Sequence, residues 1–441
     1  MKILILTHPL HTNYGGLLQA FALQKTLREL GCGGNDVRTI DWIRRRALWA
    51  RVARFVLALG WRLFKKFILR KNGVCVFPKR KPPRDGSEMR RFVAENIRTT
   101  PRVNAYRLGR ELVRLGEAPD AFVVGSDQVW RRAYIQNLPA FFLGFLRGTD
   151  TRTRRVAYAA SFGIDFWDYT PAETRVCAAL AQKFHAISVR EYSGVALCEK
   201  HLGVRAEHLP DPTMLLSRED YCEIIARDEA RGFLKNRDTE TVAVGGNARR
   251  HIVLSYVLDE TPEKRALVNA AARELGADAE ARELMPRAEG AAFPPVSAWL
   301  CGFRDAAFVV TDSFHGCVFS VIFNKDFIAI GNAARGMARF KSLLKKLGLE
   351  ERLIVLGTDA GEQGAGTAAG AGTAADAGTA AERVSALVAA RIDWPRVNAI
   401  RSREAARARE FLTNALGGNG GSDAAAGNSR GDAEARRFDA D

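Results

Sequence analysis

The stretch KILILTHPLHTNYGGLLQAFALQKTLRELG (residues 2–31), followed by VRTIDW (37–42), decides the fold class. KILILT is a continuous apolar run, which is typical of a strand buried on both faces of a parallel sheet. The segment LLQAFALQKTLREL then carries apolar residues at helical spacing, and Gly31 suits the end of that helix. Because VRTIDW has the composition of a second strand, the order strand, helix, strand predicts the βαβ unit of a doubly wound α/β domain.

The same pattern, an apolar strand followed by polar residues, recurs along the chain. DAFVVGSDQVW (120–130) and RVAYAASFG (155–163) complete an N-terminal domain over residues 1–175. A second domain over 176–356 is predicted from six further strands: AISVRE (186–191), AEHLPDPTMLL (206–216), HIVLSYVL (251–258), AAFVVTDSFHG (306–316), FIAIG (327–331) and RLIVLG (352–357). Ligands of such sheets bind beyond the carboxyl ends of the strands, where the polar residues fall.

The rest of the chain has a different composition. Residues 357–381 form a low-complexity insert of Gly, Ala and Thr. A helical pattern resumes over 382–416 as a closing segment, whereas 417–441 have little to bury and are expected to be disordered. The length of 441 residues agrees with two domains and these additions.

Cysteine usage and the N-terminus predict an intracellular protein. The seven cysteines are scattered and never spaced as CxxC, which argues against a disulfide framework and a zinc site and suits reduced thiols in the cytoplasm. The opening MKILILTHPL is too short for the apolar core of a signal peptide and fits a first buried strand instead.

The positive charge of the chain is concentrated in one region. The formal net charge is +16, and residues 44–91 alone contain sixteen Lys and Arg but only two acidic residues. The remainder is therefore nearly neutral. Because this basic stretch lacks a nucleic-acid reading motif, we do not expect nucleic-acid binding.

The basic region, a helical excursion over 44–100, contains the amphipathic segment RVARFVLALGWRLFKKFIL (51–69). Its charges recur every three to four residues, so it cannot span a bilayer. Two interpretations remain open. The segment either lies on an anionic membrane surface, at the inner face of the membrane, or packs on the domain with its basic face in water.

The polar residues in FVVTDSFHGCVFSVIF (308–323) form the strongest candidate site. His315 follows a strand and begins a helix, where an imidazole could transfer protons or hold an anion. Asp312 either orients His315 or caps the helix, and Ser313 lies between them. Lys325 and Arg339 lie downstream and could add positive charge.

Polar residues after three other strands are further candidates. His8, Asn13, Gly15 and Gly16 lie between a strand and a helix start, which suits phosphate or sugar binding but also a structural turn. The group Ser126, Asp127, Gln128 and Trp130 suits a carbohydrate, with a helix N-cap as the alternative. Arg190 suits a bidentate phosphate or carboxylate, unless Asp211 is its structural salt-bridge partner.

Taken together, these motifs resemble the polysaccharide pyruvyl transferase family. The matching stretches occur in the family's order over roughly residues 1–356: NYGGLLQAFALQKTL, DAFVVGSDQVW, RVAYAASFG, ISVRE, LPDPTMLL, WLCGFRDAAFVVTDSFHGCVFSVIF and ARFKSLLKKLGLEERLI. The resemblance implies an α/β fold of two Rossmann-like domains facing a cleft, similar to GT-B glycosyltransferases, with a C-terminal helical segment.

The resemblance also implies a reaction and the residues that carry it. Family members transfer the carboxyvinyl unit of phosphoenolpyruvate, a co-substrate, to sugar hydroxyls during surface polysaccharide synthesis, with no cofactor and no metal. His315 matches the family's functional His, and Arg190 matches a basic residue associated with the donor. Many ketal-forming members have an Arg two places before that His, where this chain has Ser313, and Lys325 or Arg339 could supply the missing cation.

The expected partner is a glycan or a lipid-linked oligosaccharide, bound through the first-domain residues named above. Two alternatives remain: a nucleotide-sugar glycosyltransferase on the same architecture, and a non-catalytic, membrane-associated glycan-binding protein.

Overall fold

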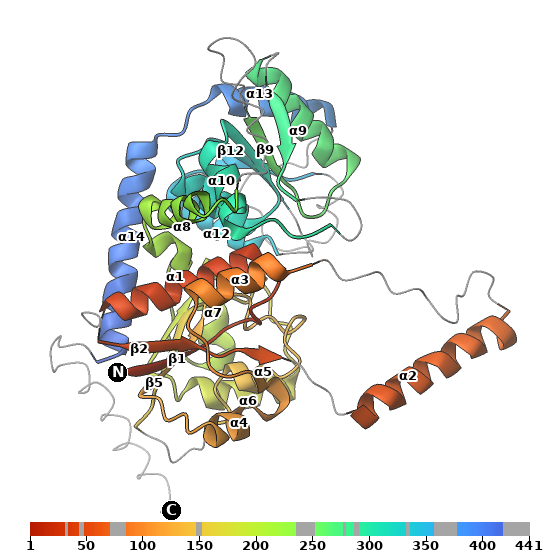
Figure 1. Ribbon diagram of the computed structural model, residues 1–441, viewed down its shortest axis with the longest axis vertical. Helices are drawn as coiled ribbons and strands as arrows, with labels where there is room; N and C mark the ends of the chain where they lie inside the picture. Colours follow the sequence, from red (N-terminus) through yellow and green to blue (C-terminus); the bar gives the residue numbers. More distant parts are fainter. Residues whose placement is uncertain are drawn as a thin grey trace, which may run out of the picture.

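The computed structural model describes residues 1–30, 34–43, 48–70, 85–146, 152–234, 252–276, 279–285, 291–331, 336–356 and 377–417. In these residues the chain forms two α/β units, and helix α14 (Trp394–Ala415) runs alongside both (Figure 1). Most of the predicted insert (357–381) and all but Gly417 of the predicted tail (417–441) lie outside the described residues.

The first unit is built on a six-stranded parallel sheet. Its strand order is β2 (Asp36–Thr39), β1 (Lys2–Leu6), β5 (Ala121–Gly125), β6 (Arg154–Ala160), β7 (Ala186–Val189) and β8 (Glu207–His208). The continuous apolar run of β1 is explained by burial on both faces, since Ile3 and Ile5 join one apolar cluster and Leu4 and Leu6 join another.

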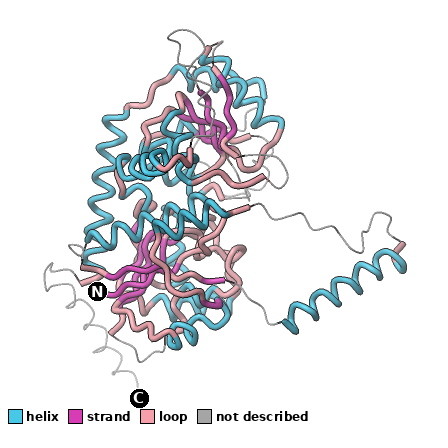
Figure 2. The backbone as a smooth tube through the Cα atoms, in the orientation of Figure 1, coloured by secondary structure: helices cyan, strands magenta, loops and turns pink. Residues whose placement is uncertain are grey.

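The second unit contains a five-stranded parallel sheet. Its order is β10 (Glu280–Glu283), β9 (Ile252–Tyr256), β11 (Phe308–Thr311), β12 (Phe327–Ile330) and β13 (Leu353–Ile354). Helices α9 (Pro262–Leu275) and α13 (Ala377–Ala389) cover one face, and α10 (Val296–Asp305) and α11 (Phe314–Ile322) cover the other. Figure 2 shows each sheet enclosed by helices. The predicted α/β class with two Rossmann-like units is confirmed.

The predicted boundary at residue 175 is wrong. Strands β7 and β8 pair with the first sheet, β7 against β6 and β8 against β7, although we assigned both to the second domain. The first sheet therefore extends to His208. All these strands share the same pattern of an apolar run followed by polar residues, so the pattern alone does not distinguish one sheet from the other.

The remaining described elements connect the two sheets or cover them. They are α1 (Tyr14–Leu30), β3 (Trp42–Ile43), α2 (Leu48–Leu63), η1 (Phe64–Ile68), α3 (Ser87–Asn96), β4 (Val103–Asn104), η2 (Ala105–Arg107), α4 (Leu108–Arg114), α5 (Leu138–Phe141), α6 (Pro171–Ala181), α7 (Tyr192–Leu197), η3 (Cys198–Leu202), η4 (Pro212–Leu215), α8 (Arg218–Ala230), α12 (Ala338–Leu347) and η7 (Glu350–Arg352).

Contacts between α1 and α10 hold the carboxyl ends of the two sheets toward each other. The ring of Tyr14 stacks on Trp299 with centroids 5.5 Å apart, and its hydroxyl donates to the Pro294 carbonyl at 2.7 Å. Both side chains are almost completely buried. The polar loops that follow the strands of both units are therefore fixed around one space.

Helix α2 lies apart from both units (Figure 1). The sequence predicted a helix over 51–69, and the structure has α2 from Leu48 to Leu63, continued by η1 to Ile68. Within the described residues, no helix combines the length and the apolar character needed to cross a bilayer.

Candidate active site

A cavity of about 780 Å³ lies between the two units, at the carboxyl ends of β1, β5, β9 and β11. Of the sequence-predicted site residues, the structure brings ten to it: His8, Asn13, Gly15, Gly16, Asp127, Gln128, Asp312, Ser313, His315 and Arg339. A volume of this size is typical of a small-molecule site. The predicted cleft between the two domains is present; that it binds a ligand stays a prediction.

His315 reaches from the second unit into the first. It lies in the first turn of α11, immediately after β11, and its imidazole packs on the backbone of Gly15 in α1. A Cβ atom at Gly15 would overlap the His315 ring at Nδ1. Gly15 was predicted to admit a ligand, but the space beside its Cα is filled by this imidazole.

The other ring nitrogen of His315 faces a buried carboxylate. His315 Nε2 lies 3.6 Å from Asp211 Oδ2, and the side chain of Asp211 is completely buried. The second carboxylate oxygen, Oδ1, accepts from the backbone N–H and the hydroxyl of Thr213 at 3.0 and 2.7 Å. Burial alone would raise the pKa of Asp211, but the neighbouring imidazole of His315 and the charge of Arg190 hold that pKa far below its usual range.

Arg190 shares the same carboxylate oxygen. Its Nη1 donates to Asp211 Oδ2 at 2.5 Å, and its Nη2 lies 3.6 Å from Asp127 Oδ1. Burial alone would lower the pKa of Arg190, but Asp211 and Asp127 raise it. The structural alternative, an ion pair with Asp211, is therefore confirmed. Arg190 is only 3% exposed and lies behind the cavity wall.

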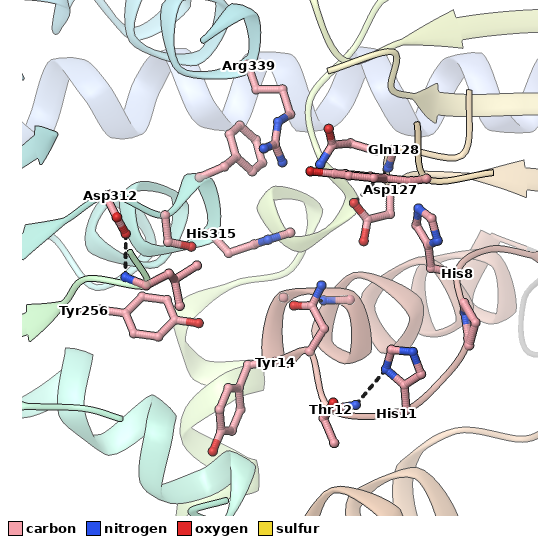
Figure 3. Close-up of a pocket in the computed structure, with 18 of the residues that line it drawn as sticks. His8, His11, Thr12, Tyr14, Asp127, Gln128, Tyr256, Asp312, His315 and Arg339 are labelled. Atoms are coloured by element: carbon pink, nitrogen blue, oxygen red, sulfur yellow. Dashed lines mark hydrogen bonds between the residues drawn. The ribbon is translucent and has the colours of Figure 1, made fainter. Parts of the chain in front are cut away.

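Arg339, from the first turn of α12, is the guanidinium that lines the cavity itself (Figure 3). It lies 5.5 Å from the Phe314 ring centroid, and Arg190 lies 4.7 Å from the same centroid. Burial and the charge of Arg190 lower the pKa of Arg339 to about 10, so it remains a cation at neutral pH. Both guanidinium groups therefore lie near the ring of Phe314, whose neighbours in the chain are Ser313 and His315.

Lys325 was predicted beside the donor, and this prediction is wrong. Helix α11 separates Lys325 from His315, and nine helical residues span about 13 Å. The Lys325 ammonium is instead half-buried, where burial and the charge of Arg218 lower its pKa.

Asp312 borders the cavity, but the hydrogen bonds of its carboxylate differ from both predicted alternatives, orienting His315 and capping α11. It accepts from the backbone N–H groups of Leu258 and Asp259 at 2.7 and 3.1 Å, and from Lys264 Nζ at 3.0 Å. It therefore holds the segment between β9 and α9 against α11. The carboxylate beside His315 Nε2 belongs to Asp211, so the prediction that Asp312 orients His315 is wrong.

The first unit contributes a second acidic group to the cavity. In Figure 3 the Asp127 carboxylate points between the imidazoles of His8 and His315. Burial would raise its pKa, but the charges of His8, Arg190 and His315 lower it, so Asp127 is ionised at neutral pH.

Three other predicted residues of this wall are held by local hydrogen bonds. Gln128 Oε1 accepts from Arg131 Nη1 at 2.9 Å, and Asn13 Oδ1 accepts from the Gly16 N–H at 3.2 Å at the start of α1. Both of these predicted side chains therefore border the cavity from fixed positions.

Two predicted acceptor-binding residues lie behind the cavity. Trp130 is fully buried, stacks on Phe142 with centroids 4.6 Å apart and donates from its indole N–H to the Phe141 carbonyl at 3.1 Å. Ser126 is also fully buried, and its hydroxyl donates to Asp211 Oδ2 at 3.3 Å. The prediction that Trp130 stacks on a sugar is wrong, because its ring is buried in the apolar core.

The structure adds cavity residues that the sequence did not single out. His11, Tyr14, Tyr134 and Tyr256 line the same space. His11 lies in the same loop as His8, so its position in the sequence could have identified it as a candidate. Tyr134 follows Trp130 in the same polar stretch. Tyr256 ends strand β9, for which the sequence predicted no site residue.

Glu191 is a buried acid behind this wall. Its pKa is raised by burial, against the opposing charge of Arg190, and its carboxylate accepts from the Ser161 hydroxyl and the Gly163 N–H. In the described part of the chain, no group of three or more His, Cys, Asp or Glu side chains is arranged to hold a metal ion.

The chain is similar to solved structures of UDP-GlcNAc 2-epimerase from Neisseria meningitidis bound to UDP-GlcNAc (10% identity, 94% of this chain and 99% of that chain, TM-score 0.45). It is also similar to an α,α-trehalose-phosphate synthase (UDP-forming) from Burkholderia vietnamiensis (12% identity, 94% and 96%, TM-score 0.43). No curated protein matches the chain. The family model for polysaccharide pyruvyl transferase matches residues 13–333, which include His315 and most of the cavity wall, and the chain belongs to that family.

Proposed function

We propose that this chain transfers the pyruvyl unit of phosphoenolpyruvate to two hydroxyls of a sugar in a surface-polysaccharide precursor, forming a ketal. The observation that supports this reaction most directly is the position of Arg339. Its buried guanidinium lines the same cavity as Ser313, the position where many ketal-forming relatives carry Arg. A cation supplied from α12 restores the charge that a phosphate or carboxylate requires.

The residues at the cavity have the groups that the chemistry needs. His315 protonates the methylene carbon of the donor while an acceptor hydroxyl attacks C2. That hydroxyl passes its proton to the pair formed by Asp127 and His8. The bond from C2 to the phosphate oxygen then breaks, and phosphate leaves with the electron pair. A second hydroxyl adds to C2 and gives up its proton, so the products are the ketal and inorganic phosphate.

The two walls suggest how the substrates are arranged. The donor is an anion, which favours the side of Arg339 and Ser313. The acceptor is neutral and rich in hydroxyls, which favours the first-unit wall of His8, Asp127 and Gln128. A glycan, free or linked to a lipid, is the acceptor class that we propose.

The test is turnover of phosphoenolpyruvate with candidate glycans. We expect phosphate release, a glycan mass higher by one pyruvate ketal, and deuterium in the new methyl group when the reaction runs in D₂O. Arg339→Gln should raise KM for phosphoenolpyruvate by at least about tenfold, through the loss of a charge-assisted contact. Lys325→Gln is the matched control and should leave KM unchanged, since Lys325 lies beyond the far end of α11.

Two experimental outcomes would contradict the proposed reaction. Thermal stabilisation by a nucleoside diphosphate but not by phosphoenolpyruvate, together with turnover of a nucleotide sugar, would replace the proposal with glycosyl transfer. Full cellular function of a His315→Ala variant would indicate a non-catalytic glycan-binding role.

A further inference from the structure

The segment α2–η1, residues 48–68, exposes an unusual amount of apolar surface. The described part of the chain has eighteen exposed large apolar side chains, and ten of them lie between residues 52 and 69: Val52, Phe55, Val56, Leu57, Trp61, Leu63, Phe64, Phe67, Ile68 and Leu69. Leu57 is 72% exposed and Ile68 is 67% exposed. A contiguous apolar surface of this kind on a soluble protein marks an interaction site.

The apolar side chains are arranged around the helix in a broad arc. Within α2, with about 100° of rotation per residue, the exposed apolar side chains cover about 240° of the helix, from Phe55 to Trp61, and Arg62 lies in the remaining sector. Residues 64–68 continue this helix as a π-helical turn, which has a smaller rotation per residue.

An aromatic group lies at the edge of this arc. The Trp61 ring stacks on Phe64 with centroids 5.6 Å apart, and Lys65 Nζ lies 5.1 Å from the Trp61 ring centroid. Trp at the boundary between an apolar arc and a basic strip is typical of a helix lying in a membrane interface.

The positive charge of this region favours one class of binding partner over the others. Residues 42–84 contain fourteen Lys and Arg and no Asp or Glu. A second copy of the chain would bring the same positive charge against this segment. A nucleic acid would satisfy the charge but not the apolar arc. An anionic lipid surface offers both acyl chains and phosphates.

We propose that α2–η1 is a docking helix that lies flat on an anionic phospholipid bilayer. Its apolar arc enters the boundary between headgroups and acyl chains, and its basic side chains contact lipid phosphates. The position of α2 apart from both units leaves the whole arc accessible (Figure 1). This inference does not depend on the proposed reaction, because none of the α2–η1 side chains that the structure describes lines the cavity.

The test is co-sedimentation of the full chain with vesicles. One set contains equal parts of phosphatidylglycerol and phosphatidylcholine, and the other contains phosphatidylcholine alone. We expect binding to the first set that weakens with added salt, and little binding to the second. The substitutions Arg62→Gln, Lys65→Gln and Lys66→Gln together should lower the partition coefficient roughly 100-fold. The substitutions Leu57→Ser, Phe64→Ser and Phe67→Ser together should abolish binding.

The matched control is on α4, which also exposes apolar and basic side chains. Arg110→Gln, Val113→Ser and Arg114→Gln together should leave vesicle binding unchanged. Because none of the substituted α2–η1 side chains is buried, their variants should unfold at the same temperature as the parent. Equal binding to both vesicle sets, or binding that survives the apolar substitutions, would overturn the proposal. A dimer in solution that the apolar substitutions dissociate, without vesicle binding, would assign this surface to a second copy.

Discussion

His315 Nε2 lies 3.6 Å from Asp211 Oδ2, and this pair joins a helix of the second unit to a residue that follows the last strand of the first sheet. The same carboxylate oxygen accepts from Arg190. Asp211 therefore both orients the imidazole and neutralises a buried guanidinium. A His at the domain boundary keeps one orientation only while both units remain in place.

Asp211→Asn removes both of these interactions. The amide no longer neutralises Arg190, so we expect a loss of roughly 3–5 kcal/mol in the free energy of unfolding. We also expect kcat to fall by about 100-fold or more and its pH profile to change, because Nε2 of His315 loses its anionic partner. In the His315→Ala background, the same substitution should lower kcat no further. Equal effects of Asp211→Asn in both backgrounds would show that Asp211 does not act through His315.

Gly15→Ala tests the packing of the imidazole against α1. The added methyl would overlap the His315 ring, so the ring must move and kcat should fall by about tenfold or more, while α1 itself gains helix propensity. Gly16→Ala is the control, since a Cβ there would lie 3.3 Å from the Asn13 side chain and needs only a small adjustment. Loss of activity in Gly16→Ala but not in Gly15→Ala would contradict this account.

The sequence predicted the strands and most of the cavity residues because both are determined by the order of neighbouring residues along the chain. A buried parallel strand is a continuous apolar run, and the polar residues after it must lie at the carboxyl edge of the sheet. His8, Asp127 and His315 were found in this way. Contacts between distant segments were not predictable by the same means. Nothing near His315 in the chain indicates that Asp211 faces it.

How deeply each aromatic side chain is buried in the cavity wall was also not predictable from the spacing of residues in the sequence. Trp130 and Tyr134 lie four residues apart in one polar stretch, yet Trp130 is fully buried and Tyr134 is 38% exposed. The packing of Phe142, Phe162 and Phe184 on the indole keeps the Trp130 ring in the core.

This difference predicts opposite effects for two aromatic substitutions. Trp130→Ala should cost about 3–5 kcal/mol of stability through the cavity it leaves, and should leave KM for the glycan unchanged in the molecules that remain folded. Tyr134→Ala should cost little stability and raise KM for the glycan severalfold, because a sugar face can stack on its ring. Urea unfolding and steady-state kinetics measure both quantities. A specific rise of KM in Trp130→Ala, at unchanged stability, would return Trp130 to the acceptor site.

His208 predicts how stability depends on pH. Its ring is 9% exposed, its Nε2 lies 3.1 Å from the Arg190 carbonyl oxygen, and burial together with the charge of Lys346 lowers its pKa to about 3 from an ordinary 6.5. Below pH 6.5 the unfolded chain therefore binds a proton at His208 that the folded chain does not. Stability from this group is complete above pH 6.5 and falls by about 1.4 kcal/mol per pH unit down to about pH 3.

His208→Gln isolates this contribution, because an amide can still donate to the Arg190 carbonyl but does not titrate. Between about pH 7.5 and about pH 5, the parent chain should lose roughly 2 kcal/mol more stability than the variant, measured by urea unfolding at each pH. Other acids and histidines titrate in both proteins, so their effects cancel in the difference. Parallel pH profiles for the two proteins would mean that His208 is charged in the folded state, and its burial against Arg190 would then need another counter-charge.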